Sequence, residues 1–69
     1  MTFSQMINSL TRSRFKRKRW PEGTYIYYGY LPSDQYESFP CILFVRPGGR
    51  TTKFMITDND KQARDWEEC

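Results

Sequence analysis

The chain has 69 residues with a net charge of +3, and 17% of them are aromatic. It contains no histidine and no Cys-x-x-Cys pair, its cysteines being Cys41 and Cys69, so we expect no zinc site. No apolar run approaches the roughly 18 residues that span a membrane, and no signal-peptide pattern is present, so we expect one soluble, cytoplasmic domain. A domain this short buries only about 60% of the surface that its unfolded chain exposes, and its many rings favour self-association.

The first third of the chain predicts a short helix followed by a basic extended segment. Thr2 and Gln5 have the Thr-x-x-Gln spacing of a capping box. Residues 15–20 are expected to be extended, and proline and glycine end this segment in a turn at 21–23. Apolar residues at helical spacing predict a helix over 3–12, and they are Phe3, Met6, Ile7 and Leu10.

The middle of the chain predicts strands and turns. β-branched and aromatic residues predict a strand over 24–30, and a continuous apolar run predicts a strand buried on both faces over 41–45. The polar, proline-containing residues 31–40 between them are typical of a loop. Arg-Pro-Gly-Gly at 46–49 predicts a type II turn, after which 51–56 returns as a hairpin partner.

The last part of the chain predicts a short helix. Thr57 suits the N-cap, and the acidic residues Asp58 and Asp60 suit the first turn. Residues 66–68 then add either one more turn or a last strand. We therefore expect an α+β fold with a short N-terminal helix, a small twisted antiparallel sheet of about four strands and a short C-terminal helical turn.

A basic run is the strongest indication of a ligand. Four adjacent cations at 16–19 stand between Phe15 and Trp20, and no acidic residue precedes Glu22. Cations beside flat rings suit a ligand that carries phosphate and a base. The competing interpretation is a solvated strand edge whose lysines prevent unwanted pairing. Arginine is the better candidate for a defined site, because its fork binds phosphate bidentately.

Tyrosines occupy both faces of the strand predicted over 24–30, because alternate residues point to opposite sides. They are Tyr25 and Tyr27 on one face, and Tyr28 and Tyr30 on the other. One set must be exposed or lie in an interface, where it would form a stacking platform for bases. The competing interpretation is a core face with an amphipathic outer face. For Trp20 and Trp66 a core position is the favoured interpretation in a chain this small, and a ligand contact is the alternative.

Nothing in the chain predicts catalysis. It has no His base, no Ser-His or Cys-His pair and no carboxylates with metal-ligand spacing. The glycine pair at 48–49 lacks the Gly-x-x-x-x-Gly-Lys pattern of a phosphate-binding loop. We therefore expect a binding protein without a cofactor rather than an enzyme.

The two ends of the chain carry a characteristic order of short motifs. Thr-Phe opens the predicted helix, residues 17–23 read Arg-Lys-Arg-Trp-Pro-Glu-Gly, and residues 57–66 read Thr-Asp-Asn-Asp-Lys-Gln-Ala-Arg-Asp-Trp. In this order and spacing the chain resembles the phage Thoeris anti-defence protein 2 family over about residues 1–28 and 54–69. Phe54 stands where the family commonly has tryptophan, which leaves a stacking ring without an indole N–H.

The resemblance implies a sponge for cyclic nucleotide immune signals. Such a protein forms a homo-oligomer, here expected to be a tetramer, and binds its ligand at subunit interfaces without cleaving it. The implied ligands are cyclic ADP-ribose isomers, with cyclic oligonucleotides at a separate place. The mechanism is equilibrium capture, in which the signal is withheld from its effector, and nanomolar affinity corresponds to roughly −12 kcal/mol.

The resemblance also implies which side chains bind the ligand. Two arginines hold the pyrophosphate, two rings stack on the purine, and a carboxylate accepts hydrogen bonds from ribose hydroxyls. In that order they are Arg17 and Arg19, Trp20 and Phe54, and Asp60 or Asp65. Three further rings complete the expected site, namely Phe3, Tyr27 and Trp66.

Two other classes of function compete with the sponge. A small nucleic-acid-binding module would use the same basic segment with Tyr25 and Tyr27. Such a binder with six or more phosphate contacts would lose about 10³-fold or more in affinity between about 50 and 200 mM salt, whereas a sponge would lose far less. A protein-binding inhibitor, which ranks third, would use the aromatic surface on a host protein and retain no small ligand.

Overall fold

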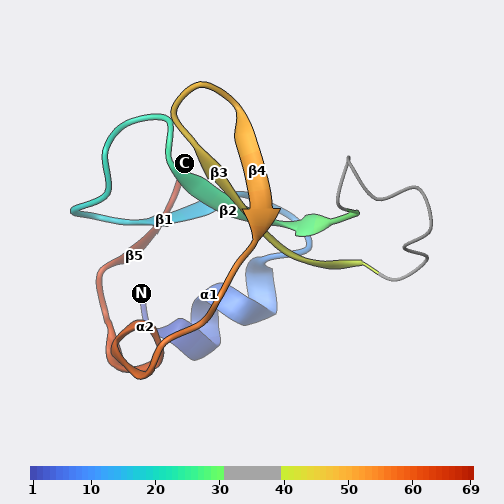
Figure 1. The fold of residues 1–69 in the computed structure, drawn as a ribbon. Helices are drawn as coiled ribbons and strands as arrows, with labels where there is room; N and C mark the ends of the chain where they lie inside the picture. Colours follow the sequence, from blue (N-terminus) through green and yellow to red (C-terminus); the bar gives the residue numbers. More distant parts are fainter. Residues whose placement is uncertain (31–39) are drawn as a thin grey trace.

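A computed structural model describes residues 1–30 and 40–69, which form two short helices and one antiparallel sheet. The sheet has five strands in the order β4-β3-β2-β1-β5. This confirms the expected α+β class, with one strand more than predicted. The predicted loop over 31–40 lies outside the described residues except for Pro40. In chain order (Figure 1) the elements are α1 Phe3–Ser9, β1 Phe15–Arg17, β2 Tyr25–Gly29, β3 Cys41–Arg46, β4 Arg50–Lys53, α2 Asp58–Gln62 and β5 Trp66–Glu68.

Local sequence signals explain both helix starts and the hairpin turn. The Thr2 Oγ1 atom accepts a hydrogen bond from the N–H of Gln5 at 3.2 Å, and the Gln5 side chain accepts one from the N–H of Thr2. This pair of bonds confirms the capping box. Thr57 caps α2 in the same way. Gly48 has a φ of +95°, and the N–H of Gly49 donates to the Arg46 carbonyl at 3.0 Å, as the predicted type II turn requires.

Helix α1 is shorter than the prediction of 3–12. It ends at Ser9, because the N–H groups of Leu10 and Arg12 donate to carbonyls three residues earlier and not four. Such tight bonds close a helix into a turn. The apolar spacing continued to Leu10, so it identified the buried face but not the end of the helix.

The prediction that residues 15–20 run extended was wrong in its second half. Strand β1 contains only Phe15–Arg17, and the chain turns at residues 18–19. The N–H of Trp20 donates to the Arg17 carbonyl at 3.0 Å, which closes this turn. Arg19 is therefore exposed on a turn rather than aligned with Arg17 along a strand.

The last strand resolves the alternative left open for residues 66–68. β5 pairs with the outer edge of β1, with Arg17 opposite Trp66 and Phe15 opposite Glu68. Strand β1 thus lies inside the sheet, between β2 and β5. Its single lysine, Lys16, does not blunt a free edge and lies 3.9 Å from the Glu67 carboxylate.

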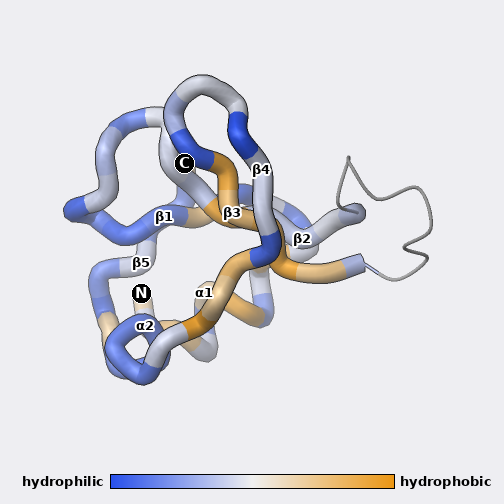
Figure 2. Tube along the Cα trace, in the orientation of Figure 1, coloured by the Kyte–Doolittle hydropathy of each residue, from blue (hydrophilic) through white to orange (hydrophobic). Residues whose placement is uncertain are grey.

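The hydrophobic core lies on the side of the sheet that both helices cover, and we call this side the helix-covered face (Figure 1). Figure 2 shows hydrophobic residues along α1 and β3, and hydrophilic residues along α2 and the connection between β1 and β2. Neither helix of the described chain is long and apolar enough to cross a membrane. The buried core cluster consists of Met6, Leu10, Phe15, Ile26 and Trp66.

The other side of the sheet, which we call the tyrosine face, carries residues that alternate with the core. Tyr25 is opposite Val45 and Tyr27 is opposite Leu43, so these four side chains share one face. Leu43 is fully buried and Val45 is 8% exposed, while the alternating Ile42 and Phe44 on the helix-covered face are half-buried. Strand β3 thus contributes apolar side chains to both faces, as its continuous apolar run predicted.

Candidate functional site

Four of the expected ligand-binding rings pack against one another on the helix-covered face. Trp20 stacks on Phe44, a ring that sequence reasoning did not single out, with centroids 5.3 Å apart and planes inclined by 27°. The edges of Phe54 and Trp66 meet Trp20 at 6.0 and 5.5 Å. Phe3 meets Trp66 at 6.1 Å. Trp66 is 2% exposed and belongs to the core, whereas Phe3, Trp20 and Phe54 keep part of their surface accessible.

Arg17 is buried and bound to carboxylates of the same chain. Its Nε donates to the Asp65 carboxylate at 2.6 Å, and its Nη1 donates to Asp60 at 3.1 Å. The Nη1 atom also lies 3.3 Å from the Asn59 side-chain oxygen, and the guanidinium sits 5.7 Å from the Trp66 ring centroid. A buried guanidinium in such a network links β1 to α2 and to the start of β5. Two of the Arg17 nitrogens already bind side chains of the same chain. The predicted contact of Arg17 with pyrophosphate stays a prediction.

Asp60 is the hub of this network. Its Oδ1 accepts from Arg17, while its Oδ2 accepts from the N–H and hydroxyl of Thr57 at 3.0 and 2.9 Å. The backbone carbonyl of Asp60 accepts from the indole N–H of Trp66 at 3.1 Å. With 8% exposure and both carboxylate oxygens bonded, Asp60 closes the first turn of α2 and neutralises a buried cation. Its predicted contact with ribose hydroxyls is not tested by this geometry.

Asp65 is the more accessible acid of the network, with 29% of its side chain exposed. Burial raises the pKa of Asp65, but the hydrogen bond from Arg17 and its positive charge outweigh burial and hold that pKa below the usual 3.8. Arg19 contributes more weakly to the same lowering. Asp65 is therefore ionised at neutral pH and holds the Arg17 guanidinium in place.

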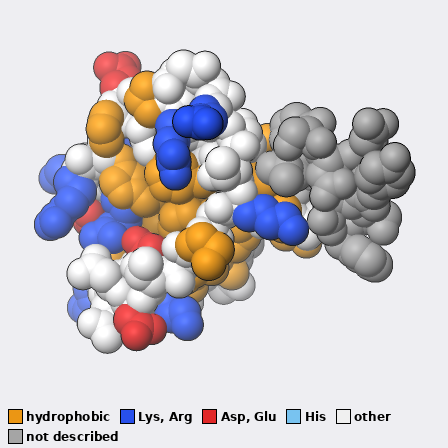
Figure 3. Space-filling view, in the orientation of Figure 1, with side chains coloured by type: hydrophobic (Ala, Val, Ile, Leu, Met, Phe, Trp, Pro, Cys, Tyr) orange, Lys and Arg blue, Asp and Glu red, His pale blue; other side chains and the backbone are white. Residues whose placement is uncertain are grey.

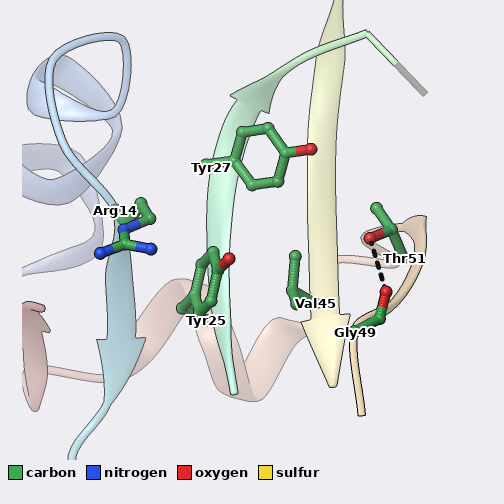
Figure 4. A pocket seen from close by; sticks show the side chains of 6 residues that line it. All are labelled: Arg14, Tyr25, Tyr27, Val45, Gly49 and Thr51. Atoms are coloured by element: carbon green, nitrogen blue, oxygen red, sulfur yellow. Dashed lines mark hydrogen bonds between the residues drawn. The ribbon is translucent and has the colours of Figure 1, made fainter. Parts of the chain in front are cut away.

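A hollow on the tyrosine face combines a cation with aromatic rings (Figure 4). The Arg14 guanidinium carbon lies 4.7 Å from the Tyr25 ring centroid, and the Tyr25 and Tyr27 rings are 6.2 Å apart and inclined by 43°. The hollow has a volume of about 290 Å³. We call it the tyrosine hollow, and it is lined by Arg14, Tyr25, Tyr27, Val45, Gly49 and Thr51.

Glycine residues shape two walls of the tyrosine hollow. A Cβ atom on Gly29 would lie 3.0 Å from the Tyr27 ring, so the absence of a side chain there lets this ring lie along the strand. At the opposite wall Gly49 has a φ of +84° and accepts a hydrogen bond from the Thr51 hydroxyl at 3.5 Å. A Cβ on Gly49 would meet nothing within 4 Å, so this wall is open to an incoming ligand.

The chain end lies beside the same wall of the hollow as Arg14. The backbone N–H of Cys69 donates to the Arg14 carbonyl at 3.0 Å. Burial raises the pKa of the Cys69 thiol, and the nearby charges of Arg14 and Lys16 only partly oppose this rise. The thiol is therefore protonated at neutral pH and adds no negative charge that would compete with an anion at Arg14.

The structure thus divides the residues that sequence reasoning had grouped into one site. Tyr27 alone among them lines the hollow, and Arg19 is exposed on a turn. The other rings lie in or against the core, and the remaining charged residues form the ion-pair network around Arg17. Sequence reasoning did not include Arg14 in the site, because the pairing of Phe15 with Ile26 is what places Arg14 on the side of Tyr25 and Tyr27. The predicted turn at 46–49 brings Gly49 and Thr51 beside Val45, but the sequence did not show that this end of the hairpin borders a hollow.

Comparison with known proteins supports the motif order seen at the two ends of the chain. No curated protein matches the chain. The model of one family, described as the Thoeris anti-defense 2-like domain, matches residues 1–69. The match also covers the middle of the chain, which carried no diagnostic motif, and it confirms the suspected family. This chain therefore belongs to the Thoeris anti-defense 2-like family.

Proposed function

We propose that this chain is a phage anti-defence protein that binds a cyclic nucleotide immune signal and withholds it from its effector in the infected cell. It performs no chemistry on the ligand and needs no cofactor. Cyclic ADP-ribose isomers are the first ligands to test, and cyclic oligonucleotides the second. Membership of the Thoeris anti-defense 2-like family supports the biological role.

The tyrosine hollow is the observation that carries this proposal. A guanidinium offers charge-assisted hydrogen bonds to a phosphate, and the tyrosine rings offer flat apolar faces to a base. Arg14 and Tyr25 already lie in contact, at 4.7 Å from guanidinium carbon to ring centroid. A ligand that carries phosphate next to a base can therefore use both groups at once.

The size of the hollow supports binding between copies of the chain. Pockets that enclose a drug-sized ligand have volumes of roughly 300–1,000 Å³, and the tyrosine hollow, at about 290 Å³, is at the bottom of this range and open on one side. One copy can hold a base and a phosphate, while a second copy closes over the rest of the ligand. The assembly we propose is the homotetramer that the family resemblance implies.

The partly exposed rings Trp20 and Phe54, together with Arg19, form the second contact region in this proposal. Trp20 and Phe54 lie on the opposite face of the sheet from the hollow, so one copy cannot bring them to the ligand that its own Arg14 holds. In an assembly, these groups of one copy approach the hollow of its neighbour. The roles of Arg17, Asp60 and Asp65 are then to hold β5 and α2 in place behind them.

Calorimetry with cyclic ADP-ribose isomers tests this function. The variant Arg14→Gln keeps a polar side chain but loses the charge and the guanidinium fork. Its dissociation constant is expected to rise about tenfold or more, since a hydrogen bond to a charged group contributes about 1.5–3 kcal/mol. Arg12→Gln is the matched control, because Arg12 is exposed and does not line the hollow. Equal binding by both variants, or no heat from the wild type at micromolar protein, would contradict the proposal.

Nucleic-acid binding is the second candidate, because Arg14, Lys16, Tyr25 and Tyr27 share one side of the sheet. The pairing of Lys16 with Glu67 reduces its positive charge. A loss of about 10³-fold in affinity between about 50 and 200 mM salt would identify this class, while a much smaller loss favours the sponge. A stoichiometric protein partner in a pull-down, with no small ligand retained, would identify a protein inhibitor.

A further inference from the structure

Two arginines face each other at the end of the β3–β4 hairpin. Arg46 and Arg50 are direct partners in the register of the two strands, and both are exposed. Directly opposed residues on antiparallel strands have their Cα atoms about 4.5–5.5 Å apart, and like charges in this position repel each other. The short hairpin fixes the spacing of their backbones, because the turn between them contains only Pro47, Gly48 and Gly49.

Arg46 is held in place by an aromatic stack. Its guanidinium carbon lies 5.4 Å from the Phe44 ring centroid, and Phe44 in turn stacks on Trp20. Residues 44 and 46 are two positions apart on β3 and therefore share one face. The arginine pair thus points to the helix-covered side of the sheet and away from the tyrosine hollow. Figure 3 shows Lys and Arg side chains over this end of the hairpin, next to hydrophobic side chains.

No carboxylate neutralises this pair among residues 1–30 and 40–69, where neither Arg46 nor Arg50 forms an ion pair. An acidic turn at 22–23 lies beside the hairpin. A Cβ on Gly23 would lie 3.8 Å from the Pro47 Cα, so this turn touches the hairpin. Its Glu22 is exposed and forms no ion pair either. Each of the two exposed guanidinium groups has about five N–H donors in a fixed fork, and no carboxylate of the described residues accepts from them.

We propose that Arg46 and Arg50 form an oxyanion clamp that binds a phosphate or pyrophosphate group. An anion between the two guanidinium groups replaces their repulsion with charge-assisted, bidentate hydrogen bonds. The Phe44–Trp20 stack keeps one arm of the clamp oriented, so less side-chain freedom is lost on binding. The clamp is distinct from the tyrosine hollow, which lies on the other face of the sheet, and it does not depend on the proposed capture of a cyclic nucleotide.

The test is a titration of the full chain with inorganic pyrophosphate, followed by NMR of the backbone amides and arginine Nε groups. Saturable shifts are expected at residues 46–50. In Arg50→Gln the dissociation constant for pyrophosphate is expected to rise about tenfold, since a hydrogen bond to a charged group is lost. Arg12→Gln, which removes an exposed cation elsewhere, is expected to leave it unchanged.

Thermal unfolding offers a second readout that needs no bound ligand. In dilute chloride buffer without phosphate, Arg50→Gln is expected to unfold at the same temperature as the wild type or higher, because the repulsion is gone. Added pyrophosphate is expected to raise the unfolding temperature of the wild type more than that of the variant. A lower unfolding temperature for the variant in chloride, or the same pyrophosphate affinity in Arg50→Gln and the wild type, would overturn the proposal.

The source of the oxyanion is distinguished by a parallel titration with adenosine diphosphate. Tighter binding of the nucleotide than of pyrophosphate, with quenching of tryptophan fluorescence, assigns the clamp to a nucleotide whose base reaches Trp20. Equal affinities assign it to a free oxyanion. Shifts spread evenly over all cations of the chain would show a general response to ionic strength, and they would overturn the clamp.

Discussion

Replacing Arg17 with methionine is expected to destabilise the fold far more than removing any exposed cation. Arg17 is 8% exposed, and its guanidinium binds Asp60 and Asp65 at 3.1 and 2.6 Å. Methionine keeps an unbranched apolar side chain over the Trp66 ring but leaves both acids without their cation. Because Asp60 is itself 8% exposed, the variant contains a buried negative charge that solvent does not reach.

The size of the effect follows from the burial of each pair. Removing one partner of a buried ion pair costs about 3–5 kcal/mol, because the other charge is left uncompensated. The Arg17–Asp60 pair belongs to this class, whereas the Asp65 half is screened by solvent through its 29% exposure. We therefore expect a loss of about 3–4 kcal/mol in the free energy of unfolding. Small domains are often stable by only about 5 kcal/mol, so the variant should be close to unfolding.

The assay is urea unfolding followed by tryptophan fluorescence, because Trp66 lies next to the Arg17 guanidinium. Lys16→Met is the matched control on the same strand, since Lys16 makes only a loose 3.9 Å contact with Glu67, and its loss should stay below about 1 kcal/mol. Adding Asp60→Asn to Arg17→Met should restore part of the stability, because the unpaired buried charge is removed. An Arg17→Met chain within about 1 kcal/mol of the wild type would refute the reasoning.

Two further predictions concern the same end of the molecule. The pKa of Asp65 lies below the usual 3.8, so the stability that its carboxylate adds should be complete above that pH and lost as the pH falls through the lower pKa of the folded chain. Urea midpoints of the wild type and Asp65→Asn should therefore converge in strong acid, and a constant difference from neutral to strongly acidic pH would contradict the assignment. Thr57→Ala removes the N-cap of α2 and one hydrogen bond to Asp60, and should cost about 1–2 kcal/mol in urea unfolding. The exposed Thr11→Ala is its control, and equal losses from both variants would count against the cap.

Sequence reasoning succeeded where one short stretch of chain contained all the partners of an interaction. The caps at Thr2 and Thr57 and the turn at Gly48 each depend on residues no more than four positions apart, and all three were predicted. The alternation of side chains along β2 likewise follows from strand geometry alone. Helix ends and strand lengths were less accurate, because tertiary packing decides whether the last turn or the last strand pair forms.

The candidate site depended on contacts between distant parts of the chain. Sequence reasoning assigned Arg17 and Asp65 to a ligand, and the structure joins them across 48 residues as a partly buried ion pair. Arg14 and Thr51 line the same hollow because the registers of β2 with β3 and of β3 with β4 bring their strands together. Composition and spacing determined the fold class, the family motifs and the surplus of cations and rings. Tertiary structure alone decided which cations remain available, because burial and strand pairing bring together charges that the linear order keeps apart.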